Sequence, residues 1–201
     1  MTNTSFDRVS FFYDFIERYI LKDYQGSMDL INRHLSLDKN YRVIDVGGGT
    51  GFFSQAIIEK VSKAVVVDPS YRMLKKIRHP NISVIQGDGS FLSVKNETFD
   101  LAVLVNVLHH IHRNKQKEVL AEAFRALKKN GRLFIIEVFF PKTFFNRLFC
   151  TLENLAVGKT YHLSAEQLES YLKDVGFTRV AMTYPKEHSW KYVALGTKKK
   201  S

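Results

Sequence analysis

The sequence predicts an α/β fold in which helices cover both faces of a doubly wound, mostly parallel sheet. Three observations predict it. Short runs rich in Val, Ile and Leu recur along the chain, helical patterns separate them, and the first run leads directly into a cluster of glycines. Nearly continuous apolar strands belong to parallel sheets buried on both faces. Strands and helices in alternation build such a sheet.

Seven apolar runs are the strand candidates. Five of them alternate with helical patterns in βαβ order, and two more follow near the C-terminus. The expected strands are Arg42–Val46, Ala64–Val67, Ile82–Ile85, Leu101–Val105, Leu133–Val138, Thr178–Met182 and Tyr192–Gly196.

The helical patterns lie between these strands at Phe52–Val61, Tyr71–Ile77 and Lys115–Lys128. Asn130 and Gly131 follow the last of them as a helix-stop signal. Ser164 and Gln167 fit a capping box that opens a further helix. Residues 6–38 read as two helices outside the sheet. We therefore expect one domain over 1–201, with a helical N-terminal cover at 1–38 and a substrate-side insertion at 139–162.

Composition supports one globular domain. The chain has 201 residues, of which 45% are hydrophobic, and this length is enough for a sizeable core. The net charge of +10 is scattered apart from a lysine run at 198–200, so charge alone names no partner. A single cysteine, Cys150, allows no internal disulfide and is expected in the core. Without a signal-like leader or a membrane-length apolar run, the interpretation is a cytoplasmic protein, with association at a membrane surface left open.

The sharpest signal is the sequence from Asp45 to Gly51, in which Gly47, Gly49 and Gly51 join a strand to a helix. Such a loop brings bare backbone and helix N-terminal amides to a ligand. The dinucleotide fingerprint needs a third glycine at position 52, which is Phe52. The spacing therefore favours another adenosine ligand, while a simple connecting turn is the structural alternative.

Two further acids follow the next two strands. Asp68 ends the second strand, where a carboxylate accepts hydrogen bonds from both ribose hydroxyls. Asp88, in Gly87-Asp88-Gly89, follows the third strand, where an acceptor could take the amino group of adenine. Each alone is explained by a solvated acid or a turn. With the glycine loop, they indicate a nucleoside site.

These motifs resemble those of class I S-adenosylmethionine-dependent methyltransferases over most of the chain. The 99–101 and 106–110 segments resemble that family's fourth-strand motif, and the end of the chain resembles its antiparallel seventh strand. The resemblance implies a Rossmann-like seven-stranded sheet and the cofactor S-adenosyl-L-methionine, with S-adenosyl-L-homocysteine as product. One departure is Phe91, where relatives often carry an acid. The cofactor-binding residues implied are Asp45, Gly47, Gly49, Gly51, Asp68, Pro69, Asp88, Gly89 and Asn106.

The catalytic residues are open. His109 and His110 follow the fourth strand and are candidates for acid/base chemistry, with a structural role as the alternative. Tyr13 lies in a segment similar to quinone-biosynthesis C-methyltransferases, so it is a third candidate. The sequence from Asn106 to Leu108 lacks the motif of base-amino methyltransferases, and no carboxylate cluster indicates a metal.

The expected acceptor is a small molecule, apolar or lipid-like. Aromatic residues crowd the N-terminal helices and the insertion, where Lys142 and Arg147 would rest at an anionic membrane surface. We expect both segments to close over the cofactor. The alternatives are an RNA methyltransferase or RNA-binding protein with a methyltransferase fold, which the net charge keeps open, and a non-enzymatic binding module. The sequence leaves the oligomeric state open.

Overall fold

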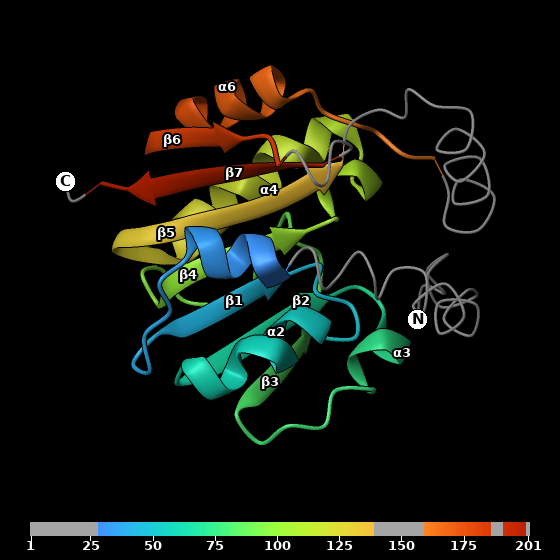
Figure 1. The fold of residues 1–201 in the computed structure, drawn as a ribbon. Helices are drawn as coiled ribbons and strands as arrows, with labels where there is room; N and C mark the ends of the chain where they lie inside the picture. Colours follow the sequence, from blue (N-terminus) through green and yellow to red (C-terminus); the bar gives the residue numbers. More distant parts are fainter. Residues whose placement is uncertain (1–27, 139–158, 186–190, 200–201) are drawn as a thin grey trace.

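The computed structural model describes residues 28–138, 159–185 and 191–199. They contain one seven-stranded sheet in the order β3-β2-β1-β4-β5-β7-β6. Every pairing is parallel except those of β7, which runs antiparallel to β5 and β6 (Figure 1). The predicted doubly wound sheet is confirmed. Its strands are β1 (Arg42–Val46), β2 (Lys63–Asp68), β3 (Ile82–Gln86), β4 (Phe99–Val105), β5 (Leu127–Val138), β6 (Phe177–Thr183) and β7 (Lys191–Lys198).

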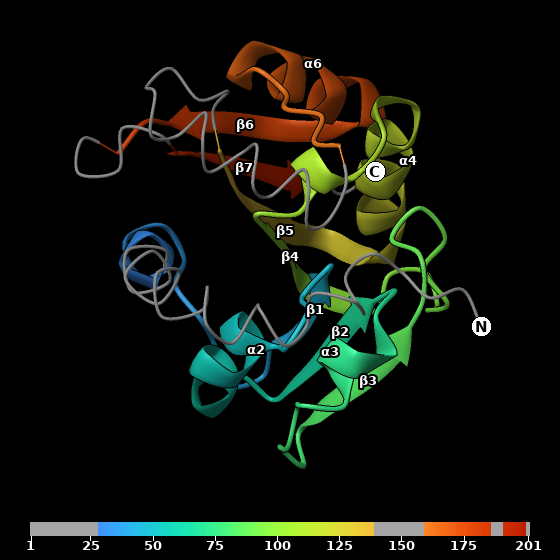
Figure 2. The same ribbon diagram turned by 90° about the vertical axis from the view of Figure 1, so that its right-hand side faces the viewer.

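Helices cover both faces of the sheet. Helical residues 28–34, α2 (Phe52–Ile57), the 3-10 turn η1 (Ile58–Lys60) and α3 (Tyr71–Leu74) share an apolar layer on one face. The helices α4 (Arg113–Ala126) and α6 (Ala165–Val175) share the layer on the other face. Figure 2 shows these two layers from the end of the sheet. Burial on both faces explains why the central strands read as continuous apolar runs.

The strand order determines which strand ends lie together at one edge of the sheet. Since β1 lies between β2 and β4, the chain winds first one way and then the other from β1. The carboxyl ends of β1, β2, β3 and β4 therefore meet at one edge, and loops at such a switch point form the ligand crevice of open α/β sheets. Asp45 pairs with Val66 and Val103 in the register of the neighbouring strands.

The predicted helix Lys115–Lys128 was wrong at its C-terminal end. The amides of Glu97 and Thr98 bind the carbonyls of Arg125 and Ala126 at 3.1 and 2.8 Å, and Leu127 then pairs with Phe99. These contacts end the helix at Ala126, two residues before the predicted Lys128, and β5 begins at Leu127, six residues before the predicted Leu133. Asn130 instead takes a left-handed backbone, with φ of 62°, within the strand.

Two other helices are also shorter than expected. The helix predicted at Phe52–Val61 divides into α2 and η1, and α3 ends at Leu74 before the chain continues in turns to Ile77. The Ser164–Gln167 capping box is confirmed at the start of α6.

Several expectations fall on residues outside the described ranges. They concern the first N-terminal helix with Tyr13, most of the 139–162 insertion with Lys142 and Arg147, and Cys150. Among the helices described, none has both the length and the apolar character needed to cross a membrane.

Candidate functional site

The glycine loop leaves the end of β1 and is held against β2. The Gly47 amide donates to the Val67 carbonyl at 2.7 Å. Gly47 and Gly49 have φ of 71° and 55°, a region that favours glycine. A Cβ on Gly49 would meet no atom of the described residues within 4 Å, so no described side chain covers the backbone there. Gly51, with φ of 70°, ends the loop and begins α2. The loop thus presents bare backbone where a ligand could lie.

Asp68 links this loop to the end of β2. One of its carboxylate oxygens accepts a hydrogen bond from the Gly49 amide at 3.0 Å, and the other accepts one from the Ser70 amide at 2.8 Å. The side chain therefore shapes the glycine loop as well as standing where a ribose could bind.

Asp45 is buried beneath the loop, with its carboxylate directly against Gly48. Its Oδ2 accepts a hydrogen bond from the Ser54 hydroxyl at 2.7 Å, whereas Oδ1 is buried and has no hydrogen-bond partner among the described residues. Burial raises the pKa of Asp45 to about 7; the Ser54 hydrogen bond opposes this shift and the charge of Asp68 adds to it. A cation beside Oδ1 would favour the ionised form.

Asn106 directly follows β4 and supplies a second buried acceptor. Its backbone is left-handed, with φ of 53°, and its amide donates to the Ile136 carbonyl at 2.9 Å. Its Oδ1 is buried and also lacks a hydrogen-bond partner within the described part of the chain. Asp45 lies near the end of β1 and Asn106 directly after the neighbouring β4, so two acceptors without a partner among the described residues lie at the switch point. They fit the chemistry of an amino group, which only donates.

Asp88 lies in an exposed turn after β3. It accepts hydrogen bonds from the Ser90 amide at 2.9 Å and the Ser90 hydroxyl at 2.8 Å, and it forms an ion pair with Lys115 at 2.9 Å. Partial burial acts to raise the pKa of Asp88, but these hydrogen bonds and the Lys115 charge hold it below its usual value. The carboxylate is therefore ionised and able to accept from an adenine amino group, in competition with Lys115.

The loops around Asp88 are fixed by neighbouring groups. The Pro69 carbonyl accepts a hydrogen bond from the Gln86 side chain at 3.1 Å, and a Cβ on Gly89 would lie 2.9 Å from Val46. Phe91 is 77% exposed, so the residue that departs from the family pattern does not pack into the loop. Instead, Arg125 of α4 donates to the carbonyls of residues 92 and 94, each at 2.8 Å.

The two histidine candidates differ in their surroundings. His109 is buried, and its Nδ1 lies 2.5 Å from Oε1 of Glu137 at the end of β5. His110 is half-buried, and its ring centroid lies 4.1 Å from that of His109. The ring of His162 stacks on His109 with centroids 5.4 Å apart. The His109 ring is thus engaged inside the protein, which favours the structural alternative for this residue.

Sequence analysis missed Glu137, Ser54 and Gln116. A lone acid inside the apolar run from Leu133 to Val138 is a signal, since a buried charge needs a partner. Ser54 and Gln116 gave no comparable signal, because polar residues on helices are ordinarily solvated.

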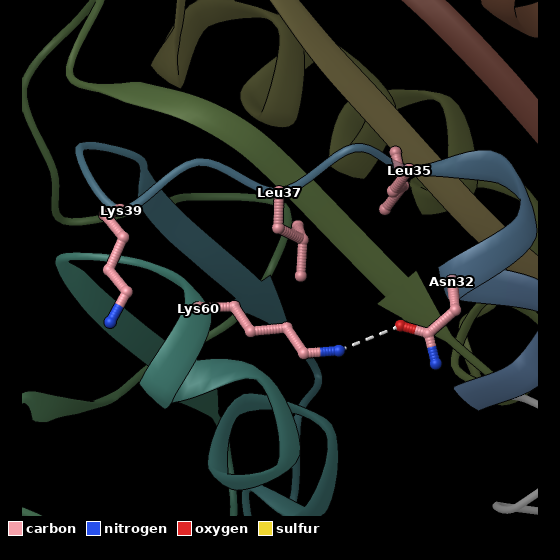
Figure 3. A pocket seen from close by; sticks show the side chains of 5 residues that line it. All are labelled: Asn32, Leu35, Leu37, Lys39 and Lys60. Atoms are coloured by element: carbon pink, nitrogen blue, oxygen red, sulfur yellow. Dashed lines mark hydrogen bonds between the residues drawn. The ribbon is translucent and has the colours of Figure 1, made fainter.

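A hollow lies away from these residues (Figure 3). It is found between the loop that precedes β1 and the end of η1, towards the amino ends of the strands. The Lys60 ammonium donates there to Asn32 Oδ1 at 3.1 Å. None of the predicted site residues lines this hollow, which is formed by Asn32, Leu35, Leu37, Lys39 and Lys60.

Comparison with known proteins agrees with this geometry. An uncharacterized protein of Methanocaldococcus jannaschii is 29% identical over 184 residues, which cover 89% of this chain and 83% of that protein. The demethylmenaquinone methyltransferase of Renibacterium salmoninarum is 35% identical over 102 residues, which cover 50% of this chain and 42% of that enzyme. The chain thus matches less than half the length of that curated enzyme.

A solved structure shares the fold over nearly its whole length. It is a SAM-dependent methyltransferase of Thermotoga maritima, with a TM-score of 0.75 at 24% identity, covering 97% of this chain and 99% of that one. A family model described as a methyltransferase domain matches residues 17–181. The glycine loop, the acids at the strand ends and these matches lead to one conclusion: the chain belongs to the methyltransferase-domain family and is a class I S-adenosylmethionine-dependent methyltransferase.

Proposed function

We propose that this chain binds S-adenosyl-L-methionine at the edge formed by β1, β2, β3 and β4 and transfers its methyl group to a small, apolar acceptor. The observation that carries the cofactor assignment is a set of two buried acceptors, Asp45 Oδ1 and Asn106 Oδ1, that have no hydrogen-bond partner among the described residues and lie at the end of the sheet that carries the glycine loop. Asp45 and Asn106 would receive the amino group of the methionine end. Gly47, Gly49 and Gly51 would lie along that end.

The nucleoside would bind across the next two loops. Asp68 and Pro69 follow β2, where Asp68 would accept the ribose hydroxyls, and Asp88 and Gly89 follow β3, where Asp88 would accept the adenine amino group. Asp88 holds Lys115 by an ion pair whose two side chains are about half exposed, an interaction of modest strength in water. A ligand donor can therefore share or displace Lys115.

The bound cofactor supplies an electrophilic methyl group on a sulfonium. The protein's part is to hold the acceptor in line with that group and to exclude water. Within the described residues, the 106–110 turn lies beside the glycine loop and brings His110 to this edge. We assign His110 the task of accepting a proton from the acceptor, because its side chain is partly exposed whereas His109 is buried against Glu137.

The acceptor class rests on the likeness to a demethylmenaquinone methyltransferase, which acts on a quinone by name. The likeness covers half of this chain, so it supports an apolar ring compound as a class and names no single molecule. The N-terminal quinone-methyltransferase-like segment points the same way.

A turnover assay with labelled cofactor tests this function. The acceptor panel should contain a reduced demethylated naphthoquinone with a short isoprenoid chain, small amines, and bulk RNA. We expect methylation of the quinol class and loss of that activity in His110→Ala, while His112→Ala keeps it. Methylation of RNA alone, with binding that falls steeply with salt, would replace the small acceptor by RNA.

A further inference from the structure

Glu137 is a fully buried carboxylate whose two oxygens both hold the turn after β4. Its Oε1 lies 2.5 Å from His109 Nδ1 and its Oε2 accepts a hydrogen bond from the His109 amide at 3.2 Å. Oε1 also accepts the Val138 amide at 2.9 Å. Burial acts to raise the pKa of Glu137, yet the His109 charge and these hydrogen bonds keep it below its usual value. The ionised carboxylate is therefore held by His109 at both ring and backbone.

The turn held by Glu137, residues 106–110, packs against the glycine loop. A Cβ on Gly47 would collide with the side chain of Val107, so Val107 lies directly on the loop backbone. Val107 precedes His109 by two residues, and the turn begins with the left-handed Asn106. Because the contact is this close, a small movement of the turn would be transmitted to Gly47.

Gln116 of α4 holds the same turn from the other side. Its side-chain amide donates to the carbonyl of Leu108 at 2.9 Å and to that of Tyr161 at 2.8 Å. The Tyr161 amide in turn donates to the His109 carbonyl at 2.6 Å. The turn is thus fixed between β5, α4 and residue 161, and the Glu137 contacts add to the Asn106–Ile136 hydrogen bond that ties it to β5.

We infer that Glu137 and His109 are positioning residues: their buried pair presses the 106–110 turn onto the glycine loop and thereby sets the affinity for the cofactor. This inference rests on the proposed function, since it concerns the same site. The pair acts through Val107 on Gly47 and through the orientation of Asn106. Neither Glu137 nor His109 needs to touch the cofactor.

Binding of S-adenosyl-L-homocysteine, measured by calorimetry, tests the pair directly. Glu137→Leu removes every contact and should weaken binding by about 30-fold or more, whereas Glu137→Gln keeps an acceptor for the His109 amide and should recover part of the affinity. Val107→Ala leaves the pair intact and should weaken binding by about 10-fold. In the double variant with Glu137→Leu, the loss of affinity should be little larger than in Glu137→Leu alone, because both changes interrupt the same contact path to Gly47.

Leu172→Ala is the matched control, a buried change on α6 that also loosens the core. It should leave the affinity within about twofold, which separates positioning from general destabilisation. With a responsive acceptor, the Glu137→Gln variant should show a raised KM for the cofactor and a nearly unchanged kcat.

Unchanged affinity in folded Glu137→Gln and Val107→Ala would overturn the inference. So would a fall in kcat with unaltered affinity, which would assign the pair to the acceptor step. Wild-type protein that binds no S-adenosyl-L-homocysteine would instead overturn the cofactor proposal, so the two failures are distinguishable.

Discussion

At the scale of single residues, Asp45 links pH, stability and the site. Burial raises its folded pKa to about 7 from 3.8. The folded protein therefore keeps a proton that the unfolded chain has released, and stability falls as pH rises from about 4 to about 7 and stays lower above that. Asp45→Asn removes this loss. We expect the free energy of unfolding at pH 8 to rise by roughly 2–4 kcal/mol, and by less at pH 5, in urea titrations.

Asp88→Asn is a control in which the expected change in stability has the opposite sign. The pKa of Asp88 in the folded protein is held below its usual value. Its ionised carboxylate therefore stabilises the folded state above the pKa of the unfolded chain, and this stabilisation is lost as pH falls through the folded-state pKa. This variant should lose stability at neutral pH and approach the wild type in acid. If the free energy of unfolding of Asp45→Asn at pH 8 equalled that of the wild type, the Asp45 carboxylate would not be buried as described.

Asp68 is expected to serve the ligand and the loop together. Asp68→Ala should reduce the affinity for S-adenosyl-L-homocysteine by about 1.5–3 kcal/mol, because charged hydrogen bonds are lost. Part of this loss arises from the Gly49 amide, which would no longer be held. Calorimetry measures it, and Asp38→Ala, an acid before β1, is the control. Equal affinity in Asp68→Ala and the wild type would remove Asp68 from the site.

The sequence predicted acids at the ends of the first three strands, where we propose the ligand site, and missed the residues that act through tertiary contacts. Asp45, Asp68 and Asp88 could be proposed because each lies at the end of a run that reads as a buried strand, or shortly after it. That the His109 ring would be engaged by Glu137 could not be predicted, since the two meet only when β4 and β5 pair with their observed register.

At the scale of elements, the α6 N-terminus has the capping box that its local sequence predicts. The Ser164 side chain accepts from the Gln167 amide at 3.2 Å, and the Gln167 side chain accepts from the Ser164 amide at 3.0 Å. Ser164→Ala should lower the free energy of unfolding by about 1 kcal/mol. Ser170→Ala, an exposed serine within α6, should be neutral or slightly stabilising. Equal effects in urea titrations would contradict the capping role.

The end of α4 departs from its local sequence signal because of tertiary contacts. Asn130 and Gly131 are typical of a helix stop, yet the helix has already ended because residues 97 and 98 bind its last carbonyls. Lys128 then reaches Asp100 with contacts of 2.8 and 2.9 Å. These partners lie about 30 positions away in the chain, so no local pattern could show them.

At the scale of the whole molecule, one sheet joins two apolar layers, and the edge where we propose that the ligand binds lies where the loops of both halves meet. The layer with α2 supports the glycine loop, while the layer with α4 supports the 87–98 loop through Arg125 and Glu122. A ligand at this edge contacts loops that depend on both layers. Binding there should therefore stabilise the described domain as a single cooperative unit.

This stabilisation distinguishes the cofactor from a dinucleotide. At about 100 times its dissociation constant, S-adenosyl-L-homocysteine should add about 2.7 kcal/mol to the free energy of unfolding. For a domain of this size, that is a rise in Tm of roughly 5–10 °C. NADH should produce none, since position 52 is Phe52 in place of the fingerprint glycine. Thermal unfolding with each ligand measures the difference.

Two glycine variants complete this test. Gly49→Ala places a methyl group in the open space beside the loop, at a φ of 55°, and should abolish the shift caused by S-adenosyl-L-homocysteine. Gly176→Ala also strains a positive φ, of 112°, but at the end of α6 and away from the strand ends. It should lower Tm without ligand and keep the ligand-induced rise. A rise preserved in Gly49→Ala, or one produced by NADH, would move the ligand away from the glycine loop or change its class.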